Sequence, residues 1–178
     1  GQVTSRNNQK ASASNEDDSQ ENDLLAQLYR DSLLQCKEVP SNVRAFITAP
    51  TLLFHKKYDD AIHILDSTYQ SYTPYSRNAG IIAYSLASAY QGKNDRENTI
   101  KYFAISAISD VLNGARENLS LKILAKLIFE SGDIDRASKY MKNAMEDAIL
   151  CNARINTIEA SDMYLFIDKA FQEKEKHK

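Results

Sequence analysis

The residues of this chain that could carry chemistry are few, and their spacing argues against catalysis. His55, His63 and His177 form no HExxH motif and no other metal-binding spacing. The sequence also lacks a GxSxG nucleophile motif and a glycine-rich phosphate loop. Cys36 and Cys151 fit no metal or redox spacing, so we expect two small core residues rather than a disulfide. We therefore predict a protein that is not an enzyme and that needs no metal or cofactor.

The acidic residues that could do acid–base work stand beside predicted helix starts. Asp59 and Asp60 precede one apolar periodic segment, and Asp133 and Asp135 precede another. A carboxylate at a helix start accepts hydrogen bonds from free N–H groups and complements the helix dipole. We interpret all four as capping residues.

The composition describes one helical domain with ordinary surface charge. The chain has 178 residues, of which 43% are hydrophobic and 26% charged, with 5 Gly and 3 Pro. A net charge of −2 gives no basic excess to neutralise phosphates, so we expect no nucleic-acid binding by this segment. No apolar run reaches the length of a membrane span, and we expect no membrane contact by this segment. Since the first residue is Gly1, we expect a piece of a larger protein.

Apolar periodicity predicts a series of helices and no strand. Residues 1–22 are almost entirely polar, which favours a flexible tail or a trimmed loop. Pro50 falls inside a predicted helix, which should kink or restart there. The helices are expected at about 24–37, 41–56, 59–72, 76–91, 96–111, 116–131, 134–149 and 153–175.

Three of the resulting helix pairs repeat at a fixed spacing. Tyr58, Arg96 and Ile134 are the first residues after three predicted corners, and they are 38 positions apart. Small residues then recur at equivalent positions, for example Ala87 facing Ser106 and Ala125 facing Ala144, which would allow two helices to approach closely. Large residues recur at Tyr90, Phe103, Ile128 and Met141, where they would fill the space between neighbouring pairs.

This pattern resembles the tetratricopeptide repeat. The third unit carries it as Leu124-Ala125, Ile128, Gly132-Asp133, Ala137, Met141 and Ala144, and the second as Leu86-Ala87, Tyr90, Asp95, Thr99, Phe103 and Ser106. The resemblance implies an all-α fold, a right-handed α-α superhelix. Its repeats would occupy 23–151, with units at about 41–74, 76–113 and 116–150, preceded by an N-terminal helix. Residues 152–178 would form a cap helix truncated from a longer protein.

A closer resemblance concerns the runs GIIAYSLASAYQGKNDRENTIKYFAISAISD and ESGDIDRASKYMKNAMEDA. They are similar to an uncharacterised family of Bacteroidetes repeat proteins with a membrane helix and a cytosolic region thought to be regulatory. The resemblance implies the sensor part of a membrane-anchored regulator, on the periplasmic side of a bacterial inner membrane.

The tetratricopeptide resemblance also assigns a concave groove to the first helix of each pair. The groove would bind a protein or peptide, with an apolar end and an end where Lys122 and Lys126 attract an anionic partner. The alternative for Lys126 is a solvated ion pair with Glu130. The predicted groove residues are Phe46, Leu53, Phe54, Tyr84, Ser88, Gln91, Lys122, Lys126, Phe129, Ala160, Tyr164 and Ile167.

A second hypothesis for the function is a structural spacer or self-association module without a dedicated ligand groove. The exposed leucines of helix 24–37 and the cap helix would then pair with another chain, giving a possible homodimer.

Overall fold

The structure is a computed structural model that describes residues 25–26, 28–36, 39–115, 119–151 and 154–176. The predicted tail at residues 1–22 lies outside these residues. All regular structure in the described residues is helical, as the sequence predicts. The chain divides into two compact units, residues 1–47 and residues 48–178, which are described separately.

In the N-terminal unit, one arginine closes the end of the first helix. Residues 25–26 and 28–35 are helical. The guanidinium of Arg44 donates hydrogen bonds to the carbonyl oxygens of Leu34 (2.7 Å) and Cys36 (2.5 Å), and a third to Val39 (3.2 Å). The last carbonyls of a helix lack partners within it, so these bonds satisfy groups that would otherwise need water. Arg44 thus fixes the turn between the first helix and α2.

Helix α2 (Ser41–Phe54) begins directly after Pro40 and continues through Pro50. The helix therefore does not restart at Pro50. Its last turns belong to the C-terminal unit.

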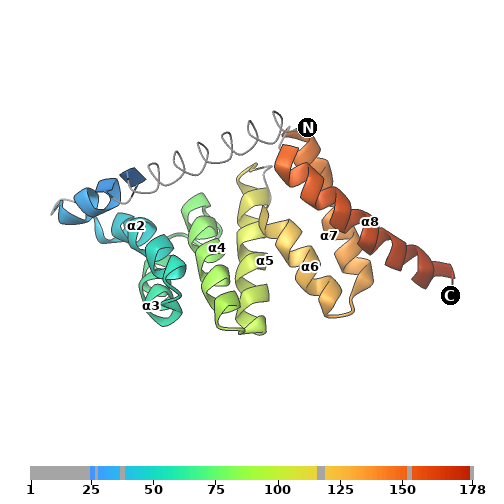
Figure 1. Ribbon diagram of the computed structural model, residues 1–178, viewed down its shortest axis with the longest axis horizontal. Helices are drawn as coiled ribbons and strands as arrows, with labels where there is room; N and C mark the ends of the chain where they lie inside the picture. The colour runs from blue at the N-terminus through green and yellow to red at the C-terminus, as the bar shows by residue number, and fades with distance from the viewer. Residues whose placement is uncertain (1–24, 27, 37–38, 116–118, 152–153, 177–178) are drawn as a thin grey trace, which may run out of the picture. The chain divides into compact units, whose positions relative to one another are not determined.

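The C-terminal unit is a row of helices in which each packs against the next in sequence (Figure 1). Helix α6 also contacts α8, two places further on. This nearest-neighbour arrangement is that of a helical repeat. After the end of α2, the helices are α3 (Tyr58–Tyr69), α4 (Arg77–Gly92), α5 (Arg96–Leu112), α6 (Leu119–Glu130), α7 (Ile134–Leu150) and α8 (Arg154–Lys176).

The three corners within the pairs have the same backbone geometry. The second helices begin at Tyr58, Arg96 and Ile134, as the 38-residue spacing predicts. Two residues before each start, the backbone has a positive φ: 58° at Lys56, 59° at Asn94 and 87° at Gly132. The next N–H then donates to a carbonyl five residues back, which is the Schellman helix ending. These bonds are Lys57 to Leu52 (2.8 Å), Asp95 to Tyr90 (3.0 Å) and Asp133 to Ile128 (3.3 Å).

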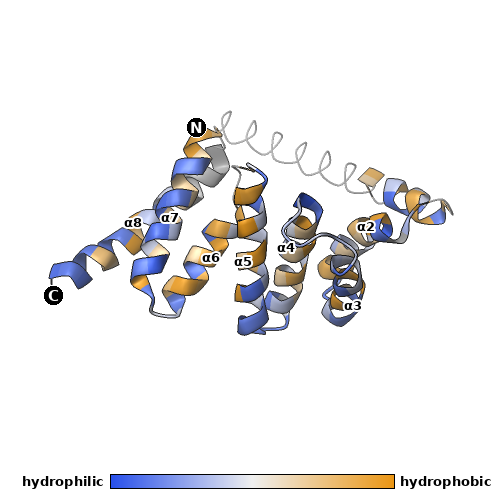
Figure 2. Ribbon diagram, turned by 180° about the vertical axis from the view of Figure 1, so that it is seen from behind, coloured by the Kyte–Doolittle hydropathy of each residue, from blue (hydrophilic) through white to orange (hydrophobic). Residues whose placement is uncertain are grey.

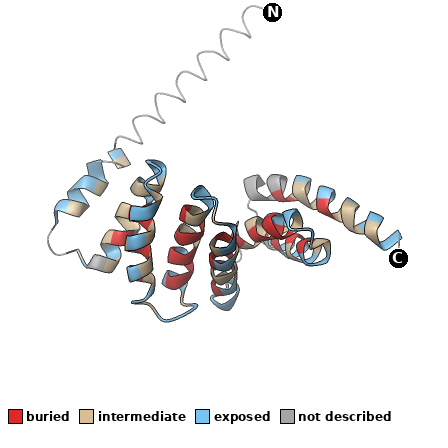
Figure 3. Cartoon of the chain, turned by 90° about the horizontal axis from the view of Figure 1, so that it is seen from below, coloured by how far each residue is buried: buried red, intermediate tan, exposed pale blue. Residues whose placement is uncertain are grey.

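Small and large residues fill the core as the repeat predicts. Ala87, Ser106, Ala125 and Ala144 are all buried. Figure 3 shows the buried residues concentrated in α4 to α7. The largest side chains that are fully buried in this unit are Leu65, Ile82, Leu86, Phe103, Met141 and Ile167.

One close helix contact was not anticipated from the sequence. A Cβ atom placed on Gly80 in α4 would lie 2.6 Å from the Cβ of Ser109 in α5. Both residues are buried. The absence of a side chain at Gly80 therefore lets the start of α4 approach the end of α5.

Two sequence expectations need correction. Cys36 and Cys151 are free but exposed, so the prediction that they are core residues is wrong. Both lie where a helix ends at the surface: Cys36 follows the first helix, and Cys151 is the C-cap of α7. Helix α3 also ends at Tyr69, three residues before its predicted end.

Candidate interaction face

The predicted site residues of α4 are partly accessible. The ring of Tyr84 meets the ring of Phe103 edge to face, with centroids 5.5 Å apart, and burial raises the pKa of its hydroxyl. Ser88 is half-buried, and its hydroxyl donates to the carbonyl oxygen of Tyr84 (3.0 Å). Gln91, the last residue but one of α4, is exposed. Tyr84 and Ser88 are thus partly committed to local contacts, whereas Gln91 faces solvent.

Helix α6 presents two cationic side chains and an aromatic one. Lys122 and Phe129 are half-buried, and Lys126 is exposed. The acid suggested as the partner of Lys126 is instead bound to Arg96: the Arg96 Nη1 to Glu130 Oε2 distance is 3.4 Å. No ion pair of Lys126 is found within 4 Å among the described residues. Lys126 is therefore available to an anionic partner.

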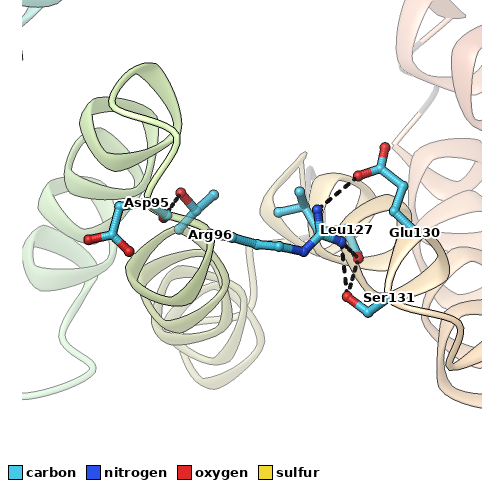
Figure 4. A network of polar contacts seen from close by, with 6 residues as sticks. Asp95, Arg96, Leu127, Glu130 and Ser131 are labelled. Carbon is cyan, nitrogen blue, oxygen red and sulfur yellow. Dashed lines mark hydrogen bonds and ion pairs between the residues drawn. The ribbon is translucent and has the colours of Figure 1, made fainter.

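Arg96 connects the second helix pair of the repeat to the third (Figure 4). Its position in the repeat does not by itself predict this role. Its Nη2 donates to the carbonyl oxygen of Leu127 (2.7 Å) and to the hydroxyl of Ser131 (2.9 Å). A cation at the C-terminal end of a helix complements the helix dipole. The start of α5 is thereby held against the end of α6, which positions the helix that carries Lys122 and Lys126.

Helix α8 contributes fewer site residues than predicted. Tyr164 is half-buried, but Ala160 and Ile167 are 1% and 0% exposed. The prediction that these two lie on an accessible groove face is wrong, because α8 buries this side against the preceding helices. Instead Phe166, which was not predicted, lies edge-on to Phe129 with ring centroids 5.4 Å apart.

The predicted residues of α2 fall on both sides of the boundary between the units. Phe46 is half-buried in the N-terminal unit and is described apart from the others. Leu53 is half-buried, and Phe54 is 83% exposed, with its ring edge-on to that of His55. Within the C-terminal unit, the residues that remain candidates are here called the first-helix face: Leu53, Phe54, Tyr84, Ser88, Gln91, Lys122, Lys126, Phe129 and Tyr164.

Of the four acids interpreted as caps, only Asp133 is an N-cap; Asp59 and Asp60 lie in the first turn of α3, which has no side-chain cap, and Asp135 lies in the first turn of α7. Asp133, which was predicted to cap, is the N-cap of α7 and accepts from the backbone N–H of Arg136 (3.1 Å). Asp95 is the N-cap of α5, and its carboxylate accepts a hydrogen bond from the backbone N–H of Asn98 (3.1 Å). The pKa of the Asp95 carboxyl is lowered by hydrogen bonds from the side-chain amide (2.7 Å) and the backbone N–H of Asn98. The pKa of the Asp133 carboxyl is lowered by hydrogen bonds from the backbone N–H and the side chain of Arg136.

Nothing in the described residues suggests a metal site or a membrane span. His55 and His63 are exposed. No group of three or more His, Cys, Asp or Glu side chains in the described part of the chain could hold a metal ion. None of the described helices combines the length and apolarity needed to cross a membrane.

The repeated helix pairs and their shared corners define a tetratricopeptide-repeat protein, a class of typically non-enzymatic scaffolds for protein interaction. A family model described as the SusR N-terminal TPR domain matches residues 4–162. The chain belongs to this family. A search of curated proteins finds no match.

Proposed function

We propose that this chain is the interaction and sensing part of a larger membrane-anchored regulator, and that its first-helix face binds a peptide segment of a partner protein. Membrane anchoring and regulation are supported by the resemblance to the Bacteroidetes repeat proteins. Binding of a protein partner is supported by membership of a tetratricopeptide-repeat family. The position of the binding surface is supported by the side chains of α6.

The observation that carries this proposal is the division of α6 into two faces. Leu124, Ala125 and Ile128 are buried and hold the helix in the array. In the same turns Lys126 is exposed and Phe129 is half-buried, so both present part of their side chain to solvent. Aromatic side chains are enriched at interaction surfaces, and an exposed cation beside them selects a partner of complementary charge.

The side chains also indicate the chemistry of the partner. Lys122 and Lys126 lie one helical turn apart, so an acidic segment would relieve the repulsion between them. The partly exposed ring of Phe129 offers an apolar contact beside them. We therefore expect an acidic peptide with at least one large apolar side chain.

The proposal can be tested by panning the 178-residue chain against a displayed library of random peptides and measuring the affinity of the selected peptides by fluorescence polarisation. We expect the selected peptides to combine acidic and large apolar residues. Lys122→Glu with Lys126→Glu should weaken their binding about tenfold or more.

A matched control is available on α7. Lys139→Glu with Lys142→Glu makes the same change of charge on two exposed lysines, and it should leave binding unchanged. Equal losses for both double variants would remove the first-helix face from the binding site. Failure to select any consensus would favour the structural-spacer hypothesis.

A further inference from the structure

Helix α8 has a solvent-exposed side that the first-helix face does not use. Its buried side carries Ala160 and Ile167. On the opposite side, Leu165 is 66% and Phe166 is 62% exposed, and Asp162 and Lys169 are also exposed. Positions 162, 165, 166 and 169 follow the i, i+3, i+4, i+7 spacing of one helical stripe. We call these four residues the outer stripe of α8; Figure 2 shows that the helix carries both hydrophobic and hydrophilic segments.

The 38-residue period allows the exposure of the stripe to be compared with that of the equivalent positions in α6. Leu165 and Phe166 correspond to Leu127 and Ile128 in α6. Those two residues are only 8% and 9% exposed, in a helix that packs against α7. The outer stripe therefore keeps apolar residues at positions that are covered by a helix elsewhere in the array, but no described helix covers them on α8. A covering helix could come from a further repeat or from another molecule.

The charged residues of the stripe indicate whether a covering helix would come from a further repeat or from another molecule. Asp162 replaces Leu124, which is 5% exposed, and Lys169 replaces Ser131. A helix packed on α8 as α7 packs on α6 would bury the carboxylate of Asp162 among apolar groups, which is costly without a cationic partner. The stripe is thus poorly suited to another repeat helix. A covering helix should instead bring a cation to Asp162 and an anion to Lys169.

A second copy of α8 meets this requirement when it runs antiparallel. Asp162 precedes Leu165 by three positions, and Lys169 follows Phe166 by three. A two-fold axis passing between Leu165 and Phe166 therefore places each Asp162 opposite Lys169 of the other copy. The same axis places Leu165 opposite the other copy's Phe166. We propose that the outer stripe of α8 is a self-complementary surface through which two copies of this chain dimerise.

The contact of Phe166 with Phe129 supports this pairing. The two rings meet edge to face with an interplanar angle of 70°. The ring of Phe166 is therefore held from one side while most of it stays exposed, which lowers the conformational cost of binding. One pair of helices buries less than the roughly 1,200 Å² of a standard interface, so we expect a reversible dimer with micromolar or weaker affinity.

Sedimentation equilibrium of the 178-residue chain over a concentration series up to about 1 mM tests the apolar part of the proposal. The wild-type chain should show a monomer–dimer equilibrium, and Leu165→Ser should raise the dissociation constant about tenfold or more. Leu112→Ser is the matched control, because Leu112 is also 66% exposed but lies at the end of α5. A chain that stays monomeric throughout, or an equal effect of the two substitutions, would overturn the proposal.

Charge reversal tests the antiparallel geometry without removing apolar area. Asp162→Lys places like charges opposite one another in the dimer, as does Lys169→Asp, and each should weaken dimerisation about tenfold. An equimolar mixture of the two single variants should form heterodimers with wild-type affinity, and the double variant in one chain should recover homodimers. If neither the mixture nor the double variant recovers dimerisation, the antiparallel pairing is wrong. Circular dichroism of each variant confirms that the helices are retained.

Discussion

At the scale of single residues, the corners show how one backbone position constrains the sequence. Lys56, Asn94 and Gly132 occupy equivalent positions in the three helix pairs of the repeat, and all have a positive φ. Glycine adopts this conformation without steric cost, asparagine tolerates it, and lysine does so with strain. The glycine of the third unit is therefore a backbone requirement that the first unit meets with an unfavourable residue.

This difference predicts opposite effects of two substitutions. Lys56→Gly should raise the free energy of unfolding by about 1 kcal/mol, because the strained residue is relieved. Gly132→Ala should lower it by a similar amount, although a Cβ atom there would meet no other atom within 4 Å. Urea denaturation followed by circular dichroism measures both changes. A destabilising Lys56→Gly would show that the lysine side chain, rather than the backbone, matters at this corner.

The N-cap Asp133 gives a prediction for pH dependence. Its pKa is lowered in the folded state by the hydrogen bonds from the backbone N–H and the side chain of Arg136. The ionised carboxylate therefore stabilises the fold at pH values above its unfolded pKa of about 4, and this stabilisation is lost as the pH falls through the folded pKa. Asp133→Asn keeps a capping oxygen but cannot ionise, so it should lower the melting temperature at pH 7.

Thermal melts of both proteins between pH 7 and pH 2.5 check this expectation. The difference in melting temperature between the wild-type chain and Asp133→Asn should shrink as the pH falls. A difference that stays constant over this range would assign the effect to cap geometry rather than to ionisation.

At the scale of the elements, the sequence predicts helix starts better than helix ends. Arg96 and Ile134 begin their helices where expected, because each follows an aspartate that caps it. The predicted end of α3 lies three residues beyond Tyr69, since no glycine marks the end before Pro74 and polar residues continue through Tyr72. Helix ends depend on backbone conformations that many residues can adopt, so the sequence signal is weak there.

Side-chain accessibility was predicted less well than helix position. The repeat correctly placed Leu124 and Met141 in the core. It placed Ala160 and Ile167 on an open face, because the period assigns them the positions of Lys122 and Phe129. In α8 these positions carry small or aliphatic residues that pack inward, and the aromatic contact to Phe129 comes from Phe166 instead.

The contact between α4 and α5 predicts the effect of a single added methyl group. Gly80→Ala would bring a Cβ atom to 2.6 Å from that of Ser109, so the two helices must separate. Overpacking of this kind costs about 1–3 kcal/mol, which is partly offset by the roughly 1 kcal/mol by which alanine favours a helix. We expect a net loss of stability in urea denaturation.

A double-mutant cycle separates the two contributions. Ser109→Gly removes the opposing Cβ atom, and in that background Gly80→Ala should no longer be destabilising. An equal cost of Gly80→Ala in both backgrounds would place the strain at another contact.

At the scale of the whole molecule, the C-terminal unit has no single central core. Each helix from α3 to α8 packs on its neighbours, and polar contacts such as those of Arg96 join successive corners. A helix of 12 to 17 residues such as α3 to α7 is marginal by itself in water, so each pair depends on the next for its stability. Loss of one large side chain between pairs should therefore weaken the array beyond its own helix.

Phe103 and Leu124 test this dependence, since they are 1% and 5% exposed in successive units. Phe103→Ala should cost about 3–5 kcal/mol and Leu124→Ala about 2–5 kcal/mol in unfolding free energy, the range for truncating buried large residues. Phe54→Ala is a matched control, because Phe54 is 83% exposed, and it should change stability little.

Hydrogen exchange followed by mass spectrometry should show faster exchange in Leu124→Ala not only in α6 but also in α5 and α7, since each packs against α6. Faster exchange confined to α6 would mean that the helices are stabilised independently, and an equal loss of stability in Phe54→Ala would contradict the assignment of the core.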